Sequence, residues 1–286
     1  MSLHSPRLTP EATVKTIIDI AHEAGGQVRA GFGVTGRVDY KGTVNPVTET
    51  DRATEELIVS RLRQAFPGCH IHGEEAGSRE GEDGGRGPRP VWLVDPLDGT
   101  NNFAHGFPHF SVSIGQVVDG RGQVGVVYDP LRDETFWASR GGGAFRDGER
   151  IHVSAVRELS DAFLATGFPY SRRVVADNNS RVLDYFLRRS QGVRRVGSAA
   201  LDLAYVACGR FDGYWEPGLG AWDVAAGLLL VEEAGGRVSD FDGGTDRILT
   251  EGEVVVSNGL IHGEMLRVLR EGAGAPHPDY GVMAGR

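Results

Sequence analysis

Two aspartates stand at the end of a strongly apolar run, in the segment WLVDPLDGTNNF at residues 92–103. Asp95 ends the run, a proline fixes the turn that follows, and Asp98 stands three residues after Asp95. Strand alternation does not explain two carboxylates at this place, whereas hard oxygen ligands at a strand end suit Mg²⁺. Gly99 lets backbone N–H groups approach an anion, and a helix beginning at Thr100 would favour phosphate there. The alternative is an aspartate-rich turn in which Asp98 caps a helix.

Two further acidic groups favour the metal site over the turn. Glu74 and Glu75 follow a predicted strand. Asp223 begins a predicted helix that continues with the nearly all-apolar run VAAGLLLV, although a carboxylate there also interacts favourably with the helix dipole. Together, Glu74, Asp95, Asp98 and Asp223 can coordinate two or three divalent cations. Without cations these carboxylates would repel one another.

The composition is that of a globular protein with room for a large core. Of the 286 residues, 40% are apolar and 24% charged, so the chain needs no disulfide or metal to form a core. Glycine occurs 42 times without a period, which excludes collagen and predicts many tight turns. The two cysteines cannot form a disulfide framework or a four-cysteine zinc site. A reducing, cytoplasmic location is therefore expected.

Charge and hydropathy restrict the partners. The net charge is −9, with acidic and basic residues interspersed, whereas a nucleic-acid ligand requires a basic face. We therefore expect no nucleic-acid partner, but phosphorylated small molecules stay open because bound cations reverse a local charge. The longest uninterrupted apolar stretch, at residues 224–231, is too short to span a membrane, and residues 1–10 lack the core of a signal peptide. No membrane association is expected.

Hydrophobic spacing divides the chain into two halves, at residues 1–154 and 155–286. In the first half, helices are predicted at residues 9–25, where Gly25 is expected to stop the helix, and at residues 50–65. Strands are predicted there at residues 69–72, 91–94, 110–118, 123–128 and 134–138, the last three as an antiparallel meander. In the second half, short strands alternate with helices, which is typical of an α/β layer. No long linker separates the halves, so we expect them to pack together.

The second half contains five predicted strands and four predicted helices. The strands are predicted at residues 163–166, 193–196, 213–215, 237–239 and 254–256, and the helices at residues 177–189, 199–208, 223–234 and 260–269. Residues 80–90, which are rich in glycine and charge, are predicted to form a surface loop. Residues 272–286 are predicted to form a poorly ordered tail.

Five sequence blocks resemble those of the inositol monophosphatase family, part of the lithium-sensitive, magnesium-dependent phosphatase superfamily. The blocks are GEE at residues 73–75, WLVDPLDGT at 92–100, WD at 222–223 with Glu232 and AGG at 234–236 behind it, NPVTETD at 45–51 and GSAA at 197–200. The second block fits the family pattern W-x-x-D-P-x-D-G-T, and its combination with the distant WD pair is highly specific. The resemblance covers residues 11–269.

The resemblance implies a metal-dependent catalytic centre. Two to three Mg²⁺ ions would be bound by five groups, namely the carboxylates of Glu74, Asp95, Asp98 and Asp223 and the carbonyl of Leu97. The implied catalytic residues are Glu74, Thr100, which resembles the hydroxyl that orients the attacking water, and Asp51, its partner. Without the resemblance, Asp51 is equally well explained as an ordinary capping residue of the second helix.

The resemblance also implies a set of substrate contacts. These are Asp98, Gly99, Thr100, Gly197, Ser198, Ala199, Glu216 and Asp223. The N–H groups of Gly99 and Thr100 would hold phosphate oxygens. Glu216 matches the carboxylate that accepts hydrogen bonds from ring hydroxyls, the alternative being a surface residue before a proline. Lys41 resembles a family lysine, but it stands one residue closer to Asp51 than the family pattern requires, and its role stays open.

By the same resemblance, the fold is an α/β (α+β) sandwich with layers in the order αβαβα. Its first half would carry an antiparallel sheet and its second half a mixed sheet, with the active site between them and a homodimer as the assembly. The implied activity is Mg²⁺-dependent hydrolysis of the phosphate monoester of a small polyol, with inositol-1-phosphate as the first candidate. Histidinol phosphate, fructose-1,6-bisphosphate and 3′-phosphoadenosine 5′-phosphate are alternative substrates. A different alternative is a regulatory protein-binding module of a transcription complex, a role that some bacterial members of the family have.

Overall fold

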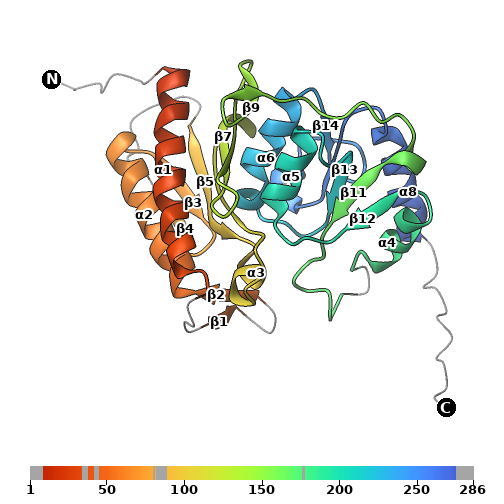
Figure 1. Ribbon diagram of the computed structural model, residues 1–286, viewed down its shortest axis with the longest axis horizontal. Helices are drawn as coiled ribbons and strands as arrows, with labels where there is room; N and C mark the ends of the chain where they lie inside the picture. Colours follow the sequence, from red (N-terminus) through yellow and green to blue (C-terminus); the bar gives the residue numbers. More distant parts are fainter. Residues whose placement is uncertain are drawn as a thin grey trace, which may run out of the picture.

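The computed structural model describes residues 9–33, 38–41, 45–79, 81, 89–175 and 178–274, with the backbone alone at 38–41 and 45–47. The chain forms five layers (Figure 1). In order, these are helices α1 (Pro10–Gly31) and α2 (Glu49–Ala65), a first sheet, helices α5 (Ala199–Ala207) and α6 (Ala221–Glu233), a second sheet, and helices α4 (Ser180–Leu187) and α8 (His262–Gly274). This arrangement confirms the predicted αβαβα sandwich. Most of the predicted 80–90 loop lies outside the described residues.

The two N-terminal helices begin at the predicted capping residues. Thr9 accepts a hydrogen bond from the N–H of Ala12 at the start of α1, where a proline follows the cap. The predicted stop at Gly25 is wrong, because α1 continues to Gly31. A Cβ atom at Gly25 would lie 2.4 Å from the ring of Tyr128, so this glycine permits close packing of the helix on the first sheet instead of ending the helix.

The first sheet has eight strands in the order β10-β9-β8-β7-β6-β5-β3-β4. The strands are β3 (His70–Gly73), β4 (Gly77–Arg79), β5 (Val91–Asp98), β6 (Ser111–Val118), β7 (Arg121–Asp129), β8 (Glu134–Ser139), β9 (Gly143–Arg146) and β10 (Glu149–Arg150). Strands β6, β7 and β8 form the predicted meander. The sheet is mixed and not purely antiparallel, because β3 and β5 pair in parallel. Strands β1 (Val38–Lys41) and β2 (Asn45–Thr48) form a separate pair, and α3 (Thr100–Ala104) follows β5.

The second sheet has five strands in the order β12-β11-β13-β15-β14. The strands are β11 (Phe163–Thr166), β12 (Gly192–Arg194), β13 (Gly213–Glu216), β14 (Arg237–Ser239) and β15 (Val254–Ser257), and the short helix α7 (Ile248–Glu251) precedes β15. Strand β11 is parallel to both neighbours and the remaining pairs are antiparallel, so the sheet is mixed as predicted. The predicted disorder from residue 272 is wrong as far as Gly274, where α8 ends.

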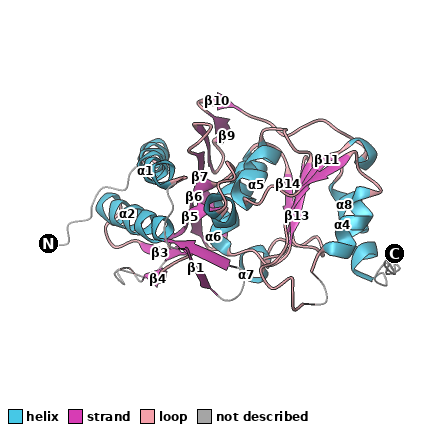
Figure 2. Ribbon diagram, turned by 60° about the horizontal axis from the view of Figure 1, so that its bottom comes forward, coloured by secondary structure: helices cyan, strands magenta, loops and turns pink. Residues whose placement is uncertain are grey.

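Helices α5 and α6 lie between the two sheets (Figure 2). Small residues let α6 approach the first sheet closely, since a Cβ atom at Gly125 of β7 would lie 2.8 Å from the Cα of Ala226. A Cβ atom at Gly227 would likewise lie 2.5 Å from the side chain of Leu203 on α5. The run VAAGLLLV is therefore buried between the layers, and the start of α6 packs against β5 and β6.

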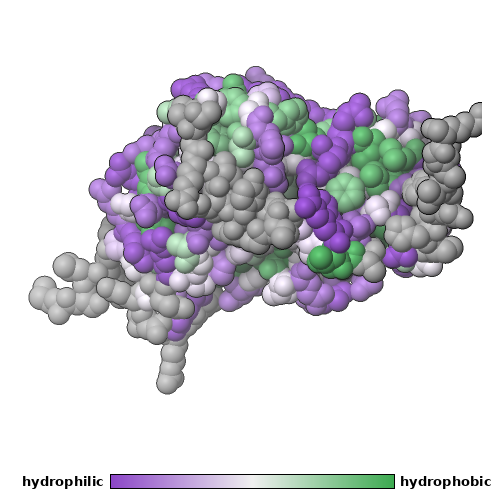
Figure 3. Space-filling model, turned by 90° about the horizontal axis from the view of Figure 1, so that it is seen from below, coloured by the Kyte–Doolittle hydropathy of each residue, from purple (hydrophilic) through white to green (hydrophobic). Residues whose placement is uncertain are grey.

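The described surface mixes polar and apolar groups. Figure 3 shows hydrophilic and hydrophobic patches side by side on the face seen from below. Among the described residues, Val174 is the most exposed large apolar side chain at 86%, followed by Leu187 and Leu260. No helix within the described residues is both long and apolar enough to cross a membrane.

Candidate metal centre

Three carboxylates from separate elements converge at one point between the sheets. One oxygen each of Glu74, Asp95 and Asp223 lies within 4.8 Å of the others. Glu74 directly follows β3, Asp95 lies in β5, and Asp223 lies in the first turn of α6. The N–H of Glu74 donates to the carbonyl of Val94 (3.2 Å), so the parallel pairing of β3 with β5 places Glu74 beside Asp95.

A bulge in β5 directs the carboxylate of Asp95. We expected the strand to end at Asp95, but it continues to Asp98 with a register shift between these two residues where they pair with β6. The N–H of Leu97 donates to Asp95 Oδ1 (2.9 Å). Bulges often change the direction of a side chain next to an active site. Asp95 and Asp98 therefore both face the middle layer instead of alternating across the sheet.

The electrostatics of the three-carboxylate cluster favour a bound cation. Burial raises the pKa of Asp95 well above its usual value, and the charges of Glu74, Asp98 and Asp223 raise it further. Burial, followed by the charges of Asp98 and Glu74, also raises the pKa of Asp223. A divalent cation among these oxygens would remove the repulsion. Since the donors are all hard carboxylate oxygens, the cluster fits Mg²⁺.

Asp98 lies beside this cluster and links it to helix α5. Its Oδ2 atom accepts hydrogen bonds from Ser198 Oγ (2.6 Å) and from the N–H of Ala200 (2.7 Å). Burial raises the pKa of Asp98 to about 6, although these hydrogen bonds oppose the rise. Asp98 is therefore not one of the three tightly grouped carboxylates, although its charge acts on Asp95 and Asp223. Its assignment as a metal ligand stays a prediction.

The predicted pair of Thr100 and Asp51 is in hydrogen-bond contact. The hydroxyl oxygen of Thr100 lies 2.9 Å from Asp51 Oδ1 and 3.0 Å from the carbonyl oxygen of Leu97. Asp51 Oδ2 accepts hydrogen bonds from the N–H (2.8 Å) and the hydroxyl of Thr48. Asp51 thus forms a capping box with Thr48 at the start of α2 and also contacts Thr100. The capping interpretation of Asp51 is therefore confirmed, and its catalytic role beside Thr100 stays a prediction.

The predicted phosphate loop has a backbone that requires glycine. Gly99 has φ +102°, and a Cβ atom there would lie 3.0 Å from the carbonyl oxygen of His109 and 3.2 Å from that of Gly197. Asn102 Nδ2 lies within hydrogen-bond distance of the carbonyl oxygens of His109 (2.7 Å) and Val196 (2.8 Å). Asn102, which the sequence analysis missed, therefore holds the chain at Val196 and Gly197 against α3. Its place four residues after Asp98 was the feature of the sequence that could have pointed to it.

Glu216 lies on β13 and is only 9% exposed, so its interpretation as a surface residue is wrong. Tyr214 donates its hydroxyl proton to Glu216 Oε2, and a Cβ atom at Gly167 would overlap the Glu216 carboxylate. Burial raises the pKa of Glu216 to about 7, while the Tyr214 hydrogen bond and the charge of Arg195 oppose the rise. The carboxylate is thus fixed in one position. Its contact with substrate stays a prediction.

Glu55 is a buried positioning residue that the sequence analysis missed. Its Oε2 atom accepts a hydrogen bond from the N–H of Glu75 (2.7 Å), and its Oε1 atom accepts one from the N–H of Ala76 (2.9 Å). The carboxylate of Glu55 occupies the space that a Cβ atom of Gly73 would need. Glu55 therefore holds the turn that carries Glu74. Its place four residues after Asp51, on the same side of α2, was the signal in the sequence.

Tyr170 is a second residue that the sequence analysis missed. The charges of the acidic cluster act on its hydroxyl, although 44% of the residue is exposed. Burial of the hydroxyl, followed by the charges of Glu74, Asp223 and Asp98, raises its pKa above the usual value. The hydroxyl therefore stays protonated and can donate a hydrogen bond. No motif marked this residue.

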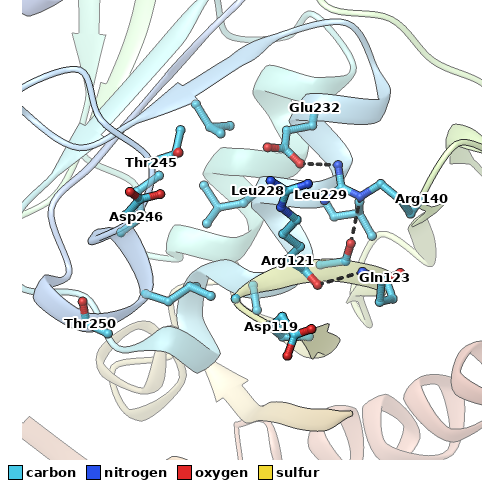
Figure 4. Close-up of a pocket in the computed structure, with 17 residues that line it drawn as sticks. Asp119, Arg121, Gln123, Arg140, Leu228, Leu229, Glu232, Thr245, Asp246 and Thr250 are labelled. Atoms are coloured by element: carbon cyan, nitrogen blue, oxygen red, sulfur yellow. Dashed lines mark hydrogen bonds and ion pairs between the residues drawn. The ribbon is translucent and has the colours of Figure 1, made fainter. Parts of the chain in front are cut away.

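A separate cavity of about 720 Å³ lies along α6, from Ala225 to Glu232 (Figure 4). Its walls come from the β6–β7 turn, from α6 and from the segment around α7. Arg140 donates hydrogen bonds to Glu232 Oε2 (2.7 Å) and to the carbonyl of Gly122 (2.9 Å), and these interactions link two of the walls. None of the predicted site residues lines this cavity, so it is distinct from the acidic cluster.

Comparisons with known proteins agree with this geometry. A family model described as inositol monophosphatase family matches residues 10–273. An inositol-1-monophosphatase from Mesorhizobium japonicum is 44% identical over 262 residues, which cover 91% of this chain and 97% of that protein. A protein named Nus factor SuhB from Pseudomonas aeruginosa is 50% identical over 224 residues, which cover 77% of this chain and 81% of that protein.

Solved structures show the same likeness. The structure of an inositol monophosphatase from Anabaena (Nostoc) sp. PCC 7120 has a TM-score of 0.81 and 40% identity, and the match covers 92% of this chain and 97% of that one. Both the sequence and the arrangement of layers are therefore shared over nearly the whole length. The chain belongs to the inositol monophosphatase family.

Proposed function

We propose that the protein is a Mg²⁺-dependent phosphatase that hydrolyses the phosphate monoester of a small polyol. The observation that carries this proposal is the convergence of Glu74, Asp95 and Asp223 within 4.8 Å, from three separate elements. A structural role would not explain three carboxylates there, because their mutual repulsion destabilises the fold unless a cation is bound. The contact between Thr100 and Asp51 supports a catalytic role for the same region.

Two to three Mg²⁺ ions would be held by Glu74, Asp95, Asp98 and Asp223 and by the carbonyl of Leu97. Bound Mg²⁺ would lower the pKa of a coordinated water molecule and would neutralise the negative charge of the phosphate. The chain's own groups then orient the reactants. The Thr100 hydroxyl donates to Asp51, which leaves its oxygen free to accept a hydrogen bond from the attacking water.

The phosphate and alcohol parts of the substrate would contact different elements. The N–H groups of Gly99 and Thr100 would bind phosphate oxygens. The alcohol would lie against the loop of Gly197, Ser198 and Ala199 and against Glu216, which accepts hydrogen bonds from neighbouring hydroxyl groups. The burial and fixed position of Glu216 support a specific contact.

Inositol-1-phosphate is the first candidate substrate. The name of the relative from Mesorhizobium japonicum, at 44% identity, supports it. The test is phosphate release with and without Mg²⁺ from inositol-1-phosphate, histidinol phosphate, fructose-1,6-bisphosphate and 3′-phosphoadenosine 5′-phosphate. Turnover that depends on Mg²⁺ and is fastest with inositol-1-phosphate is expected. Equal rates on all four would overturn the inositol assignment, and no Mg²⁺-dependent turnover would overturn the phosphatase.

A second candidate function is regulatory binding within a transcription complex. The observation in its favour is the 50% identity to a protein named Nus factor SuhB. The test is affinity capture of RNA polymerase by the wild-type protein and by the variant Asp223→Asn, which removes the charge of a proposed metal ligand. Capture by both forms would support a binding function independent of catalysis. No capture by either form would exclude it.

The remaining proposals concern location and assembly. We infer a cytoplasmic homodimer that binds no nucleic acid directly, and the net charge of −9 supports the last point. Light scattering tests the dimer, and fluorescence anisotropy with labelled RNA tests the absence of nucleic-acid binding. A monomer at micromolar concentration, or RNA binding that persists at physiological salt, would contradict these proposals.

A further inference from the structure

The first turn of α5 carries a buried carboxyl group for which the proposed mechanism has no use. Asp202 is 1% exposed, and its Oδ1 atom has no hydrogen-bond partner within the described part of the chain. An aspartate in a first turn usually serves the helix dipole at the surface. Burial without a donor is costly for an ionised carboxylate, so Asp202 requires another explanation.

Asp202 lies on a helix that packs against the strand carrying the candidate polyol contact. Helix α5 packs against β13, where Tyr214 and Glu216 lie on the same side of the strand because they are two residues apart. Both are buried, at 0% and 9% exposure. After burial, the charge of Glu216 is the largest influence on the pKa of Asp202, followed by Asp98, and all three raise it, whereas Arg195 opposes the rise.

The hydrogen-bond donors around the two carboxyl groups are unequally distributed. Glu216 accepts a hydrogen bond from the Tyr214 hydroxyl, and it is also stabilised by the N–H of Phe168 and by the charge of Arg195, against the repulsion of Asp98. Asp202 Oδ1 accepts none. Two neighbouring buried carboxyls do not both ionise readily, and the one with more donors keeps the negative charge. The proton of the pair therefore belongs on Asp202.

We propose that Asp202 is a positioning residue of the polyol subsite, which stays neutral beside Glu216 so that Glu216 carries the negative charge that accepts substrate hydroxyls. This inference rests on the proposed role of Glu216. We place Asp202 behind the substrate contact and not against the substrate, because the residue is only 1% exposed. It acts by filling the space behind Glu216 with an uncharged polar group.

The first experiment detects the proton directly and does not depend on activity. Infrared difference spectra are recorded for the Mg²⁺-loaded wild-type protein and for Asp202→Asn at neutral pH. A carbonyl stretch of a protonated carboxyl, present in the wild type and lost in the variant, is expected. If the variant instead loses a carboxylate band, Asp202 is ionised and the proposal is wrong, whatever the substrate of the enzyme.

The second experiment measures KM for inositol-1-phosphate and for p-nitrophenyl phosphate, which has no hydroxyl groups to recognise. Asp202→Ala is expected to raise KM for inositol-1-phosphate about tenfold, with little change in KM for p-nitrophenyl phosphate, because Glu216 loses its support. Asp202→Asn, a neutral group of the same shape, is expected to restore most of the wild-type KM. Glu216→Gln serves as the reference for loss of the negative charge at the polyol contact.

Three outcomes would overturn the proposal. An equal rise in KM for both substrates would indicate a general structural role, and no rise in Asp202→Ala would indicate no role. A loss in Asp202→Asn as large as in Asp202→Ala would show that a charge at Asp202 is required. If Asp202→Ala does not fold, the infrared spectrum of Asp202→Asn still decides the question. Absence of turnover on both substrates in the wild type would instead refute the proposed phosphatase.

Discussion

The imidazole of His72 stacks on the indole of Trp222, with ring centroids 5.2 Å apart and planes inclined by 15°. His72 lies two residues before Glu74, and Trp222 directly precedes Asp223. The Trp222 carbonyl also lies 3.3 Å from Ser113 Oγ on β6. The stack therefore connects the first sheet to the start of α6 beside Glu74 and Asp223. It fixes the distance between two carboxylates that are far apart in the sequence.

Removal of this stack should weaken metal binding. Trp222→Ala is expected to lower the apparent Mg²⁺ affinity about tenfold, because groups that orient metal ligands commonly contribute factors of this size. The measurement is a Mg²⁺ titration of turnover, with Trp222→Phe as the control that keeps an aromatic ring against His72. Equal Mg²⁺ requirements in both variants and the wild type would show that the stack does not position Asp223.

The variant Asp98→Asn should show whether Asp98 acts as a metal ligand or only accepts hydrogen bonds at the start of α5. The amide oxygen can still accept hydrogen bonds from Ser198 and Ala200, so the thermal melting curve should stay close to that of the wild type. Turnover is expected to fall about a hundredfold or more, because the variant removes a charge from the metal site. Turnover near the wild-type rate would mean that Asp98 only supports α5.

Thr100 offers a matched pair of variants. Thr100→Ser keeps the hydroxyl that contacts Asp51, and it should retain most of the turnover. Thr100→Val keeps the shape but removes the hydroxyl, and kcat should fall about a hundredfold with little change in KM, which is typical of a lost general acid–base or water-orienting group. If both variants lose activity to the same extent, the methyl packing of Thr100 matters and its hydroxyl does not.

Binding of Mg²⁺ should stabilise the fold. Without cations, burial and mutual repulsion raise the pKa values of Asp95 and Asp223, so folding disfavours their ionised forms. A saturating cation at a hundred times its dissociation constant adds about 2.7 kcal/mol to the free energy of unfolding. Calorimetry with Mg²⁺ or EDTA checks this, and Asp223→Asn should show a smaller rise in Tm. A Tm that does not respond to Mg²⁺ in the wild type would contradict the site.

The pH dependence of substrate binding should report Glu216. Its folded-state pKa is raised to about 7, so it gains its negative charge as the pH rises through that value. KM for inositol-1-phosphate should therefore fall as the pH rises through about 7, and this dependence should disappear in Glu216→Gln. KM for p-nitrophenyl phosphate is the control for titration of the metal ligands. The same dependence for both substrates would assign it to those ligands instead.

Ionisation of Glu216 is expected to lower the stability of the fold, although it favours substrate binding. Because the pKa of Glu216 is raised on folding, the folded state binds more protons than the unfolded state between the ordinary glutamate value and about 7. The contribution of Glu216 to stability is therefore present at low pH and is lost as the pH rises through this window. Comparing melting curves of the wild type and Glu216→Gln across the window measures it.

Local patterns predicted the elements well where the signal was strong. The cap at Thr9 and the apolar stripe that follows it predicted the start of α1, and the predicted bounds of β11 and β14 agree with the structure. The end of α1 was wrong because Gly25 faces Tyr128, and a sequence does not show which glycine permits close packing and which one stops a helix. The parallel pairing of β3 with β5 was missed because it depends on the crossover between them.

The site residues that belong to a sequence motif were predictable, whereas those whose role depends on packing were not. The aspartate motif and the family resemblance pointed to Glu74, Asp95 and Asp223, which the structure places together. Glu55 and Asp202 were missed because an acidic residue on a helix is ordinarily a solvated one, and only the fold buries them. Three-dimensional burial, which no local spacing reports, distinguishes these two from the exposed acidic residues.

Asp223 lies in the first turn of α6, between the two sheets, and this position has a consequence for biosynthesis. During translation, Glu74 and Asp95 leave the ribosome well before the third carboxylate of the cluster exists. Strands β3 and β5 must then tolerate two neighbouring carboxylates, without a complete cation site, until the helices of the middle layer pack against the first sheet. High-affinity uptake of the ion would consequently mark the completion of assembly, and a chain truncated before Asp223 would have no complete cation site.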